Sequence, residues 1–143
     1  MRSSLRSALV TAGVSALLAG CGGEDTTGPG GLELGTYTAT TFSVTPAGEA
    51  PINVLGGGGS LVITLHANGT TSGTLSVPAS AAGGTAFVES MEGTVTVTSL
   101  TVTFQQTADT FVRDLTWSRQ GQIIAVTNQV VAGTSYTIVL QRL

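Results

Sequence analysis

Apolar and polar residues alternate along much of the chain from residue 32 onward. Leu61, Ile63 and Leu65 take every second position, and the polar residues Thr64 and His66 belong to the other face. Successive side chains of a β-strand point to opposite faces, so this period of two predicts a strand with one buried face. No stretch of the region has the period of an amphipathic helix. The pattern therefore predicts an all-β domain.

Glycine-containing turns separate the predicted strands. Asn68-Gly69 is the clearest turn, because both residues tolerate the positive φ angles of a two-residue hairpin. The run Gly56–Gly59 is expected to form a mobile loop. The predicted strands are residues 34–44, 61–66, 70–77, 93–98, 100–105, 109–118, 122–131 and 135–143. Residues 52–55 are a short strand or strand-like segment, and residues 86–90 are a candidate for a further short strand.

Hairpins that follow one another along the chain predict an up-and-down meander of eight or nine antiparallel strands. The first and last strands of a meander either stay exposed as edges, which favours aggregation, or pair and close a barrel. We therefore expect an antiparallel β-barrel over residues 32–143. A β-sandwich remains the alternative, because about seven to nine strands in a domain of this length also fit an immunoglobulin-like fold.

Residues 1–20 differ from the rest of the chain and have the three parts of an export signal. Arg2 and Arg6 give a basic start, the stretch Ala8–Ala19 is mostly apolar, and small residues follow. A transmembrane helix needs about 20 apolar residues, whereas a secretory signal needs roughly 7 to 15. The stretch fits the second class, so we expect residues 1–20 to be a cleaved signal peptide.

The signal ends at Leu18-Ala19-Gly20-Cys21, which departs from the ordinary A-x-A cleavage pattern. These four residues resemble the lipobox of bacterial lipoproteins at every position. The resemblance implies that Leu18, Ala19 and Gly20 are recognised for cleavage. It implies that Cys21 receives diacylglycerol through a thioether and is then acylated on its new amino group. Two or three acyl chains give lasting membrane attachment, whereas a single acyl chain binds only marginally.

The same resemblance implies an address in the bacterial cell envelope. Gly22 stands where aspartate retains Gram-negative lipoproteins in the inner membrane, which favours the outer membrane, facing the periplasm. Cys21 is the only cysteine, so the chain has no internal disulfide, no CxxC redox pair and no cysteine-based zinc site. The stretch Gly22–Gly31 is half glycine and is expected to be a flexible tether. The expected organisation is therefore residues 1–20 signal peptide, 21–31 lipidated cysteine and tether, and 32–143 barrel.

Composition supports the β-domain and limits its partners. Threonine and valine recur, there is no lysine, and charged residues make up only 9% of the chain. β-Branched residues suit a pleated, half-buried surface. Removal of Arg2 and Arg6 with the leader leaves three arginines against eight acids, a net charge of −5. Such an acidic chain is not expected to have nucleic acid or an anionic membrane face as an electrostatic partner.

Leu34-Gly35-Thr36-Tyr37 resembles the Gly-x-Trp opening of lipocalins and lipocalin-like small lipoproteins, with Tyr37 in place of the tryptophan. The meander that follows is similar to theirs. The resemblance implies a small lipocalin-like barrel in which Arg142 packs across the aromatic ring of Tyr37. The family's disulfide and C-terminal helix have no counterpart in this sequence.

No residue combination typical of catalysis or metal binding stands out. His66 is the only histidine and is expected at the surface beside its hairpin turn. Glu89 and Glu92 lie three positions apart, but neither has a partner that would make it a general acid or base. Glu24 and Asp25 are expected to be solvated acids of the tether. We therefore expect no enzyme activity, no metal and no cofactor.

An eight-stranded barrel has an interior that is either filled by side chains or wide enough for one small ligand. The residues expected to line such a site are Tyr37, Phe42, Phe104, Phe111, Arg113 and Trp117. Two positions remain open for Arg113: the surface, over an aromatic ring, or the interior, paired with an acid or a polar ligand. We expect a membrane-anchored protein that binds a small apolar molecule. The alternative is a structural or protein-interaction lipoprotein with a filled, ligand-free barrel.

Overall fold

The computed structural model describes residues 28–143; the expected signal peptide, Cys21 and the tether up to residue 27 lie outside the described residues. The strands are β1 (Gly35–Thr45), β2 (Ile52–Asn53), β3 (Ser60–Leu65), β4 (Thr70–Val77), β5 (Phe87–Ser90), β6 (Gly93–Val97), β7 (Thr101–Gln106), β8 (Trp117–Gln120), β9 (Ile123–Val131) and β10 (Thr134–Arg142). Two short 3-10 helices, η1 (Pro29–Gly31) and η2 (Phe111–Asp114), accompany them.

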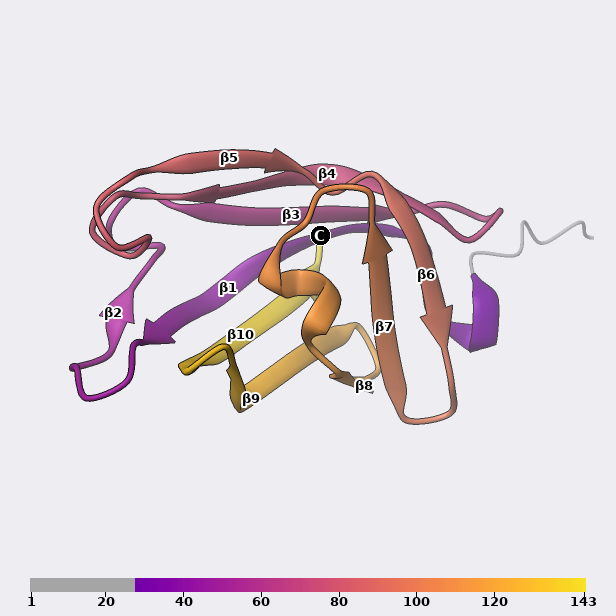
Figure 1. The fold of residues 1–143 in the computed structure, drawn as a ribbon. Helices are drawn as coiled ribbons and strands as arrows, with labels where there is room; N and C mark the ends of the chain where they lie inside the picture. The colour runs from indigo at the N-terminus through magenta and orange to yellow at the C-terminus, as the bar shows by residue number, and fades with distance from the viewer. Residues whose placement is uncertain (1–27) are drawn as a thin grey trace, which may run out of the picture.

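The strands form one antiparallel sheet that closes on itself (Figure 1). Eight of them follow one another as β1-β3-β4-β6-β7-β8-β9-β10, and β10 pairs with β1. The closing pairs run from Tyr37–Arg142 to Thr45–Ser135. The expected up-and-down barrel is confirmed, because pairing of the first and last strands is what distinguishes a closed barrel from an open sandwich.

The remaining strands, β2 and β5, lie outside this ring. β5 pairs with β4 from Thr74 to Val77, whereas β6 pairs with β4 only at Thr70 and Thr71 and then continues along β7. The chain thus bends between β5 and β6. Backbones approach closely beside this bend, because a Cβ at Gly73 would lie 2.0 Å from the carbonyl oxygen of Val62.

Apolar side chains fill the middle of the barrel. The largest fully buried side chains are those of Trp117, Tyr37, Phe42, Phe104, Leu32, Leu61, Ile63, Leu75, Met91, Leu115, Ile124 and Ile138. The rings of Phe104 and Trp117 meet edge to face with their centroids 5.6 Å apart, an arrangement that aromatic pairs favour. The middle of the barrel is therefore a packed core, and space for a ligand has to be sought at its ends.

The prediction was wrong for residues 109–118, which do not form one strand. They form a loop, η2 and the start of β8. The amide of Arg113 donates to the carbonyl of Thr110 at 3.2 Å, so the backbone turns where an extended chain was expected. Val112 is fully buried in this turn, whereas Arg113 is not. Apolar residues at every second position in so short a stretch fit a helical turn as well as a strand.

Two smaller expectations also change. The run Gly56–Gly59 is a hydrogen-bonded turn rather than a mobile loop. Its first amide donates to Oδ1 of Asn53 at 3.0 Å, and its last amide donates to the carbonyl of Val54 at 2.8 Å. The short strand expected over residues 52–55 ends at Asn53, where this turn begins.

The two ends of the barrel differ in the length of their connections (Figure 1). At one end the chain enters through η1, and short turns join β3 to β4, β6 to β7 and β8 to β9. At the other end lie the long connections, residues 46–59, 78–86 and 107–116, together with the β9–β10 turn. We call these the N-terminal end and the open end.

Candidate ligand-binding pocket

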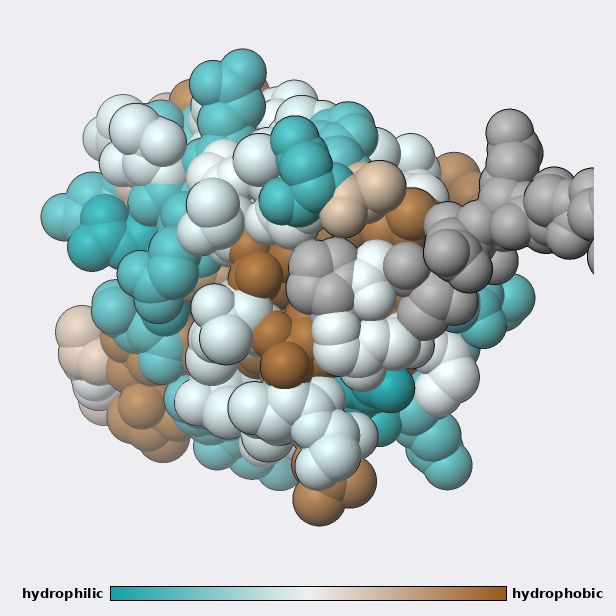
Figure 2. All heavy atoms as spheres, turned by 90° about the vertical axis from the view of Figure 1, so that its right-hand side faces the viewer, coloured by the Kyte–Doolittle hydropathy of each residue, from teal (hydrophilic) through white to brown (hydrophobic). Residues whose placement is uncertain are grey.

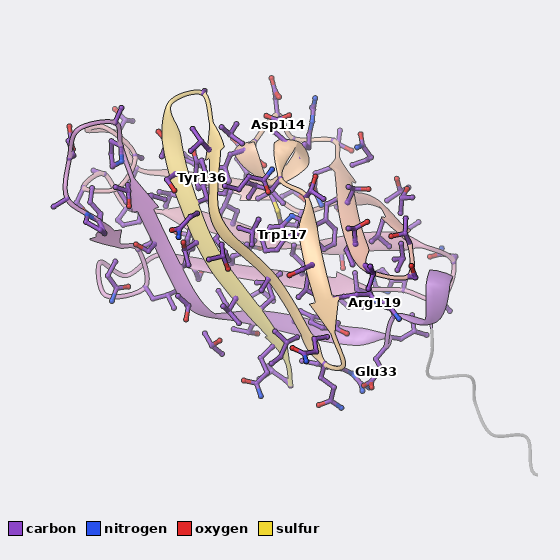
Figure 3. The ribbon with its side chains drawn as sticks, turned by 90° about the horizontal axis from the view of Figure 1, so that it is seen from below. Glu33, Asp114, Trp117, Arg119 and Tyr136 are labelled. Atoms are coloured by element: carbon purple, nitrogen blue, oxygen red, sulfur yellow. The ribbon has the colours of Figure 1, made fainter. Side chains whose placement is uncertain are left out.

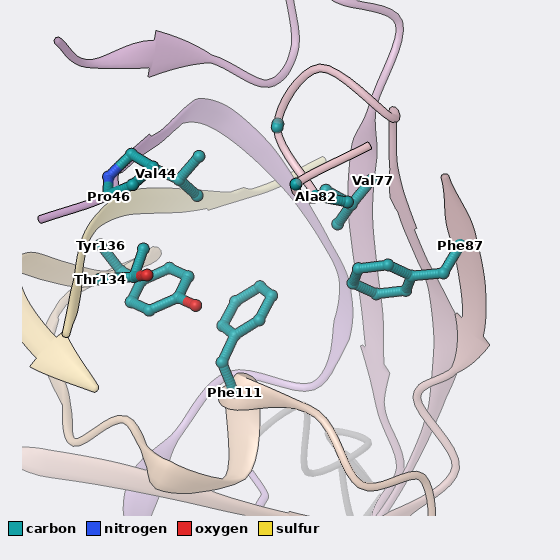
Figure 4. Close-up of a pocket in the computed structure, with 10 residues that line it drawn as sticks. Val44, Pro46, Val77, Ala82, Phe87, Phe111, Thr134 and Tyr136 are labelled. Carbon is teal, nitrogen blue, oxygen red and sulfur yellow. The ribbon is translucent and has the colours of Figure 1, made fainter. Parts of the chain in front are cut away.

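The open end of the barrel contains a pocket of about 340 Å³. The ends of β1 and β4, the connection after β4, the start of β5, η2 and the β9–β10 hairpin each supply part of its wall (Figure 4). The lining residues are Val44, Pro46, Val77, Ala81, Ala82, Gly83, Phe87, Phe111, Thr134 and Tyr136. Ligand pockets commonly have volumes of about 300 to 1,000 Å³, so this one suits a small molecule.

An aromatic stack forms one wall of the pocket. The rings of Phe111 and Tyr136 are stacked with centroids 4.4 Å apart and planes 16° from parallel. Phe42 packs against Phe111 from the core, at 6.0 Å. Phe111 reaches this position because Thr110 is extended and η2 begins directly after it. The turn that replaced the expected strand therefore carries an aromatic ring to the mouth of the barrel.

Thr134 and Tyr136 bring the hydroxyl groups to the pocket (Figure 4). Burial raises the pKa of Tyr136 above its ordinary value of 10.0, and a hydrogen bond with the side chain of Thr134 acts in the opposite direction. The phenol is therefore neutral at physiological pH. It can donate one hydrogen bond to a ligand that is otherwise held by apolar contact.

The residues expected to line a binding site are divided between three places. Phe111 lines the pocket and Phe42 lies directly behind it. Tyr37, Phe104 and Trp117 belong to the packed core, with exposed fractions of 0%. Arg113 lies at the surface, where Nη1 is 3.4 Å from the carboxylate of Asp109. Of the two positions left open for Arg113, the structure thus has the surface one, with a carboxylate as its partner.

Most of the pocket wall was not predicted from the sequence. Val77, Ala82 and Phe87 belong to the end of β4, the following connection and the start of β5, which the sequence marks only as an alanine- and glycine-rich loop beside short strands. Tyr136 belongs to the last predicted strand, residues 135–143. Its contact with Phe111 depends on η2, which the alternation did not indicate.

A cluster of hydrogen-bonded polar side chains lies at the N-terminal end of the barrel, around Glu33 (Figure 3). The carboxylate of Glu33 accepts hydrogen bonds from Nη1 of Arg142 at 2.6 Å and from Nε2 of Gln122 at 3.0 Å. The hydroxyl of Tyr37 donates to the carbonyl of Glu33 at 2.9 Å. Arg142 is paired with Tyr37 across the closing strands, and its guanidinium lies over Gly35. In Figure 3, Glu33 and Arg119 lie at one end, Asp114 and Tyr136 at the other, and Trp117 between them.

The other candidate residues are dispersed over the surface. His66 is exposed and its Nε2 lies 2.9 Å from Oγ of Ser72, and Glu89 and Glu92 are exposed as well. Within residues 28–143, no three histidine, cysteine, aspartate or glutamate side chains gather in a way that would hold a metal ion. No helix in the described part of the chain has the length and apolar character needed to cross a membrane.

Comparison of the chain with models of protein families, with curated proteins and with solved structures finds no match. The pocket and the Leu18–Cys21 sequence are therefore the features from which a function is argued.

Proposed function

We propose that this protein is anchored in the bacterial cell envelope through lipid on Cys21 and that its barrel binds one small apolar molecule at the open end. The observation that carries the binding role is the apolar pocket of about 340 Å³ with its wall of stacked rings. The lipobox-like sequence Leu18-Ala19-Gly20-Cys21 supports the anchor. The role is binding rather than catalysis.

The position of the pocket supports the combination of a lipid anchor with a binding site. The chain enters the barrel at the N-terminal end, and the pocket opens at the opposite end (Figure 1). A barrel held to a membrane through Cys21 would therefore present its pocket away from the bilayer, toward the periplasm for an outer-membrane anchor. Ligand could then enter from the aqueous side.

The chemistry of the wall favours an uncharged ligand. Val44, Val77 and Phe87 offer apolar contact, and Tyr136 offers one hydroxyl. Glu49 and Asp114, both exposed, lie on connections of the open end and disfavour anions there. We expect a neutral, mainly apolar molecule with one hydrogen-bonding group.

A direct test measures binding of N-phenylnaphthylamine, a neutral apolar fluorophore, to the non-lipidated chain from Gly22 onward, because the described barrel contains its own core and closes on itself. We expect binding at one site. Ala82→Leu, which fills the pocket, should weaken it at least about tenfold, equivalent to about 1.4 kcal/mol.

The matched control is Leu100→Ala, which changes an exposed side chain at the opposite end of the barrel. We expect this variant to bind the fluorophore like the original chain. Equal weakening by both variants, or no binding at all across a panel of neutral apolar compounds, would refute the binding role. Circular dichroism of each variant establishes that it is folded.

The anchor is tested in the full chain expressed in a Gram-negative host. Cys21→Ser should move the protein from the membrane fraction to the soluble fraction, because the thioether requires the thiol. Labelled palmitate should be incorporated by the original chain and not by the variant. Unchanged fractionation of Cys21→Ser would contradict lipid anchoring.

The second candidate is a structural or protein-interaction lipoprotein that binds no small molecule. The observation that favours it is the packed interior, in which Trp117, Tyr37 and Phe104 are fully buried. Any ligand must therefore bind at the mouth. The fluorophore experiment distinguishes the two candidates. A barrel that binds no small molecule shows no binding of the fluorophore that Ala82→Leu could weaken.

A further inference from the structure

Exposed apolar side chains gather at the N-terminal end of the barrel. Among the described residues, three of the five large apolar side chains with high exposure are there: Leu100 at 72%, Ile123 at 40% and Leu143 at 89%. Leu100 belongs to the β6–β7 turn, Ile123 begins β9, and Leu143 follows β10. Figure 2 looks onto this side of the molecule and shows apolar surface between polar regions.

Backbone pairing of β7, β8, β9 and β10 places these three positions at the same end of neighbouring strands. The carbonyl of Leu100 accepts from the amide of Arg119 at 3.1 Å, in β8. Ile123 of β9 pairs with Gln120 of β8 on one side and with Gln141 of β10 on the other. Neighbouring strands lie about 4.8 Å apart, so the three apolar side chains lie at the same end of β7 to β10, with the exposed side chains of Gln120 and Gln141 between them. We call Leu100, Ile123 and Leu143 the apolar rim.

The entering chain is fixed beside the apolar rim. Nη1 of Arg119 donates to the carbonyl of Gly30 at 2.8 Å, and Gly30 packs closely against Val97. Glu33 is held by Arg142 and Gln122, the residues next to Leu143 and Ile123. Both contacts join the segment before β1 to the strands that carry the rim. The described part of the chain therefore begins beside the apolar rim.

Only seven peptide steps separate Cys21 from Gly28. At about 3.6 Å per residue, even a fully extended chain spans no more than about 25 Å. Charge distribution agrees with a membrane on this side. At the N-terminal end Glu33 offsets Arg142 and leaves the charge of Arg119, whereas at the open end Arg113 offsets Asp109 and leaves the charges of Glu49 and Asp114.

We propose that the apolar rim docks on the lipid bilayer that holds the anchor, so that the barrel stands on the membrane in a fixed orientation with its pocket outward. The proposal rests on the lipid anchor proposed above. Exposed aliphatic side chains gain free energy when they enter the boundary between headgroups and acyl chains, and a neighbouring arginine is attracted to anionic headgroups. The anchor keeps the rim within reach of that boundary.

The test uses the mature lipidated chain in vesicles of phosphatidylethanolamine and phosphatidylglycerol. Leu100→Cys introduces a thiol for the polarity-sensitive fluorophore NBD, because the thiol of Cys21 is consumed by its lipid. The matched control is Val88→Cys, which places the same fluorophore at a position 66% exposed on β5, near the open end. Both variants should sediment with the vesicles.

We expect NBD emission at position 100 to shift to shorter wavelength in vesicles and its reduction by aqueous dithionite to slow, with neither change at position 88. Equal emission at both positions in sedimenting protein overturns docking and leaves the anchor intact. Protein that does not sediment overturns the anchor and docking together. A shift at position 100 in the non-lipidated chain without vesicles, rising with protein concentration, would assign the rim to a second copy of the chain and also overturn the proposal.

Discussion

Glu33 is the residue on which the contacts of the N-terminal end converge. Its carboxylate binds Arg142 and Gln122, and its carbonyl accepts the hydroxyl of Tyr37. The side chains of Arg142 and Glu33 are only 26% and 36% exposed, so solvent screens their ion pair less than a fully exposed one. The pair joins the segment before β1 to the last strand, next to the closure of the barrel.

We predict that Glu33→Gln lowers the free energy of unfolding by about 1 kcal/mol, because it removes the negative charge that faces Arg142. Urea denaturation followed by circular dichroism measures the change. Asp109→Asn is the control, since the side chain of Asp109 is 91% exposed and its contact with Arg113 is longer, at 3.4 Å. A loss of equal size in the control would show that charge alone, rather than this contact, is responsible.

The two tyrosines of the chain, Tyr37 and Tyr136, predict how stability changes in alkali. Burial raises the pKa of both above 10.0, and the charge of Glu33 adds to the rise at Tyr37. A raised pKa in the folded state means that the folded protein holds its protons more tightly. The corresponding stability is fully present below pH 10.0, the ordinary value, and is lost as the pH rises through the folded pKa.

We predict that ultraviolet titration of the folded protein shows both phenols ionising above pH 10.0, with a return to the ordinary value in urea. Tyr136→Phe should leave one titrating group, the buried Tyr37. The variant should also weaken the dependence of the unfolding free energy on pH in this range. A folded-state titration at or below the ordinary value would contradict burial of these hydroxyls.

Among the elements, the bend between β5 and β6 decides the shape of the barrel wall. Gly73 has a φ of +136° in β4 next to this bend, and its missing side chain allows the backbone of Val62 to approach. A Cβ there would lie 2.0 Å from the carbonyl oxygen of Val62. β4 can therefore lie this close to β3 only because glycine stands at this position.

We predict that Gly73→Ala destabilises the barrel by at least about 2 kcal/mol more than Gly58→Ala. Gly58 is the matched control because its φ is also positive, at +87°, but a Cβ there would meet nothing within 4 Å. Thermal and urea unfolding of the two variants give the comparison. Equal losses would mean that the φ angle, and not the close approach, accounts for the effect of Gly73→Ala.

At the scale of the whole molecule, the packed core and the pocket occupy different parts of the barrel. Trp117, the only tryptophan of the chain, is fully buried in the core and does not line the pocket. We predict short-wavelength emission from Trp117 that acrylamide quenches poorly, and little change when the pocket is filled. Strong quenching in the folded state would contradict the packed core.

Apart from residues 109–118, the strands and most of their boundaries follow from the sequence alone. Alternation of valine and threonine specifies a half-buried strand locally, and β6 and β7 bury Val95, Val102 and Phe104 as the pattern predicts. Closure of the barrel was expected from the order of the hairpins, but not its register, which pairs Tyr37 with Arg142. The ion pair beside this closure joins Glu33 and Arg142, 109 positions apart in sequence.

The pocket depends on contacts between segments that are distant in sequence. Phe111 was recognised as a lining residue, but its stack with Tyr136 required the turn η2, and the other walls come from connections that are distant in sequence. The turn exists because burial of Val112 and Leu115 under the end of the barrel outweighs the strand that alternation suggests. Such competition between local pattern and non-local packing has no signature in a single short stretch of sequence.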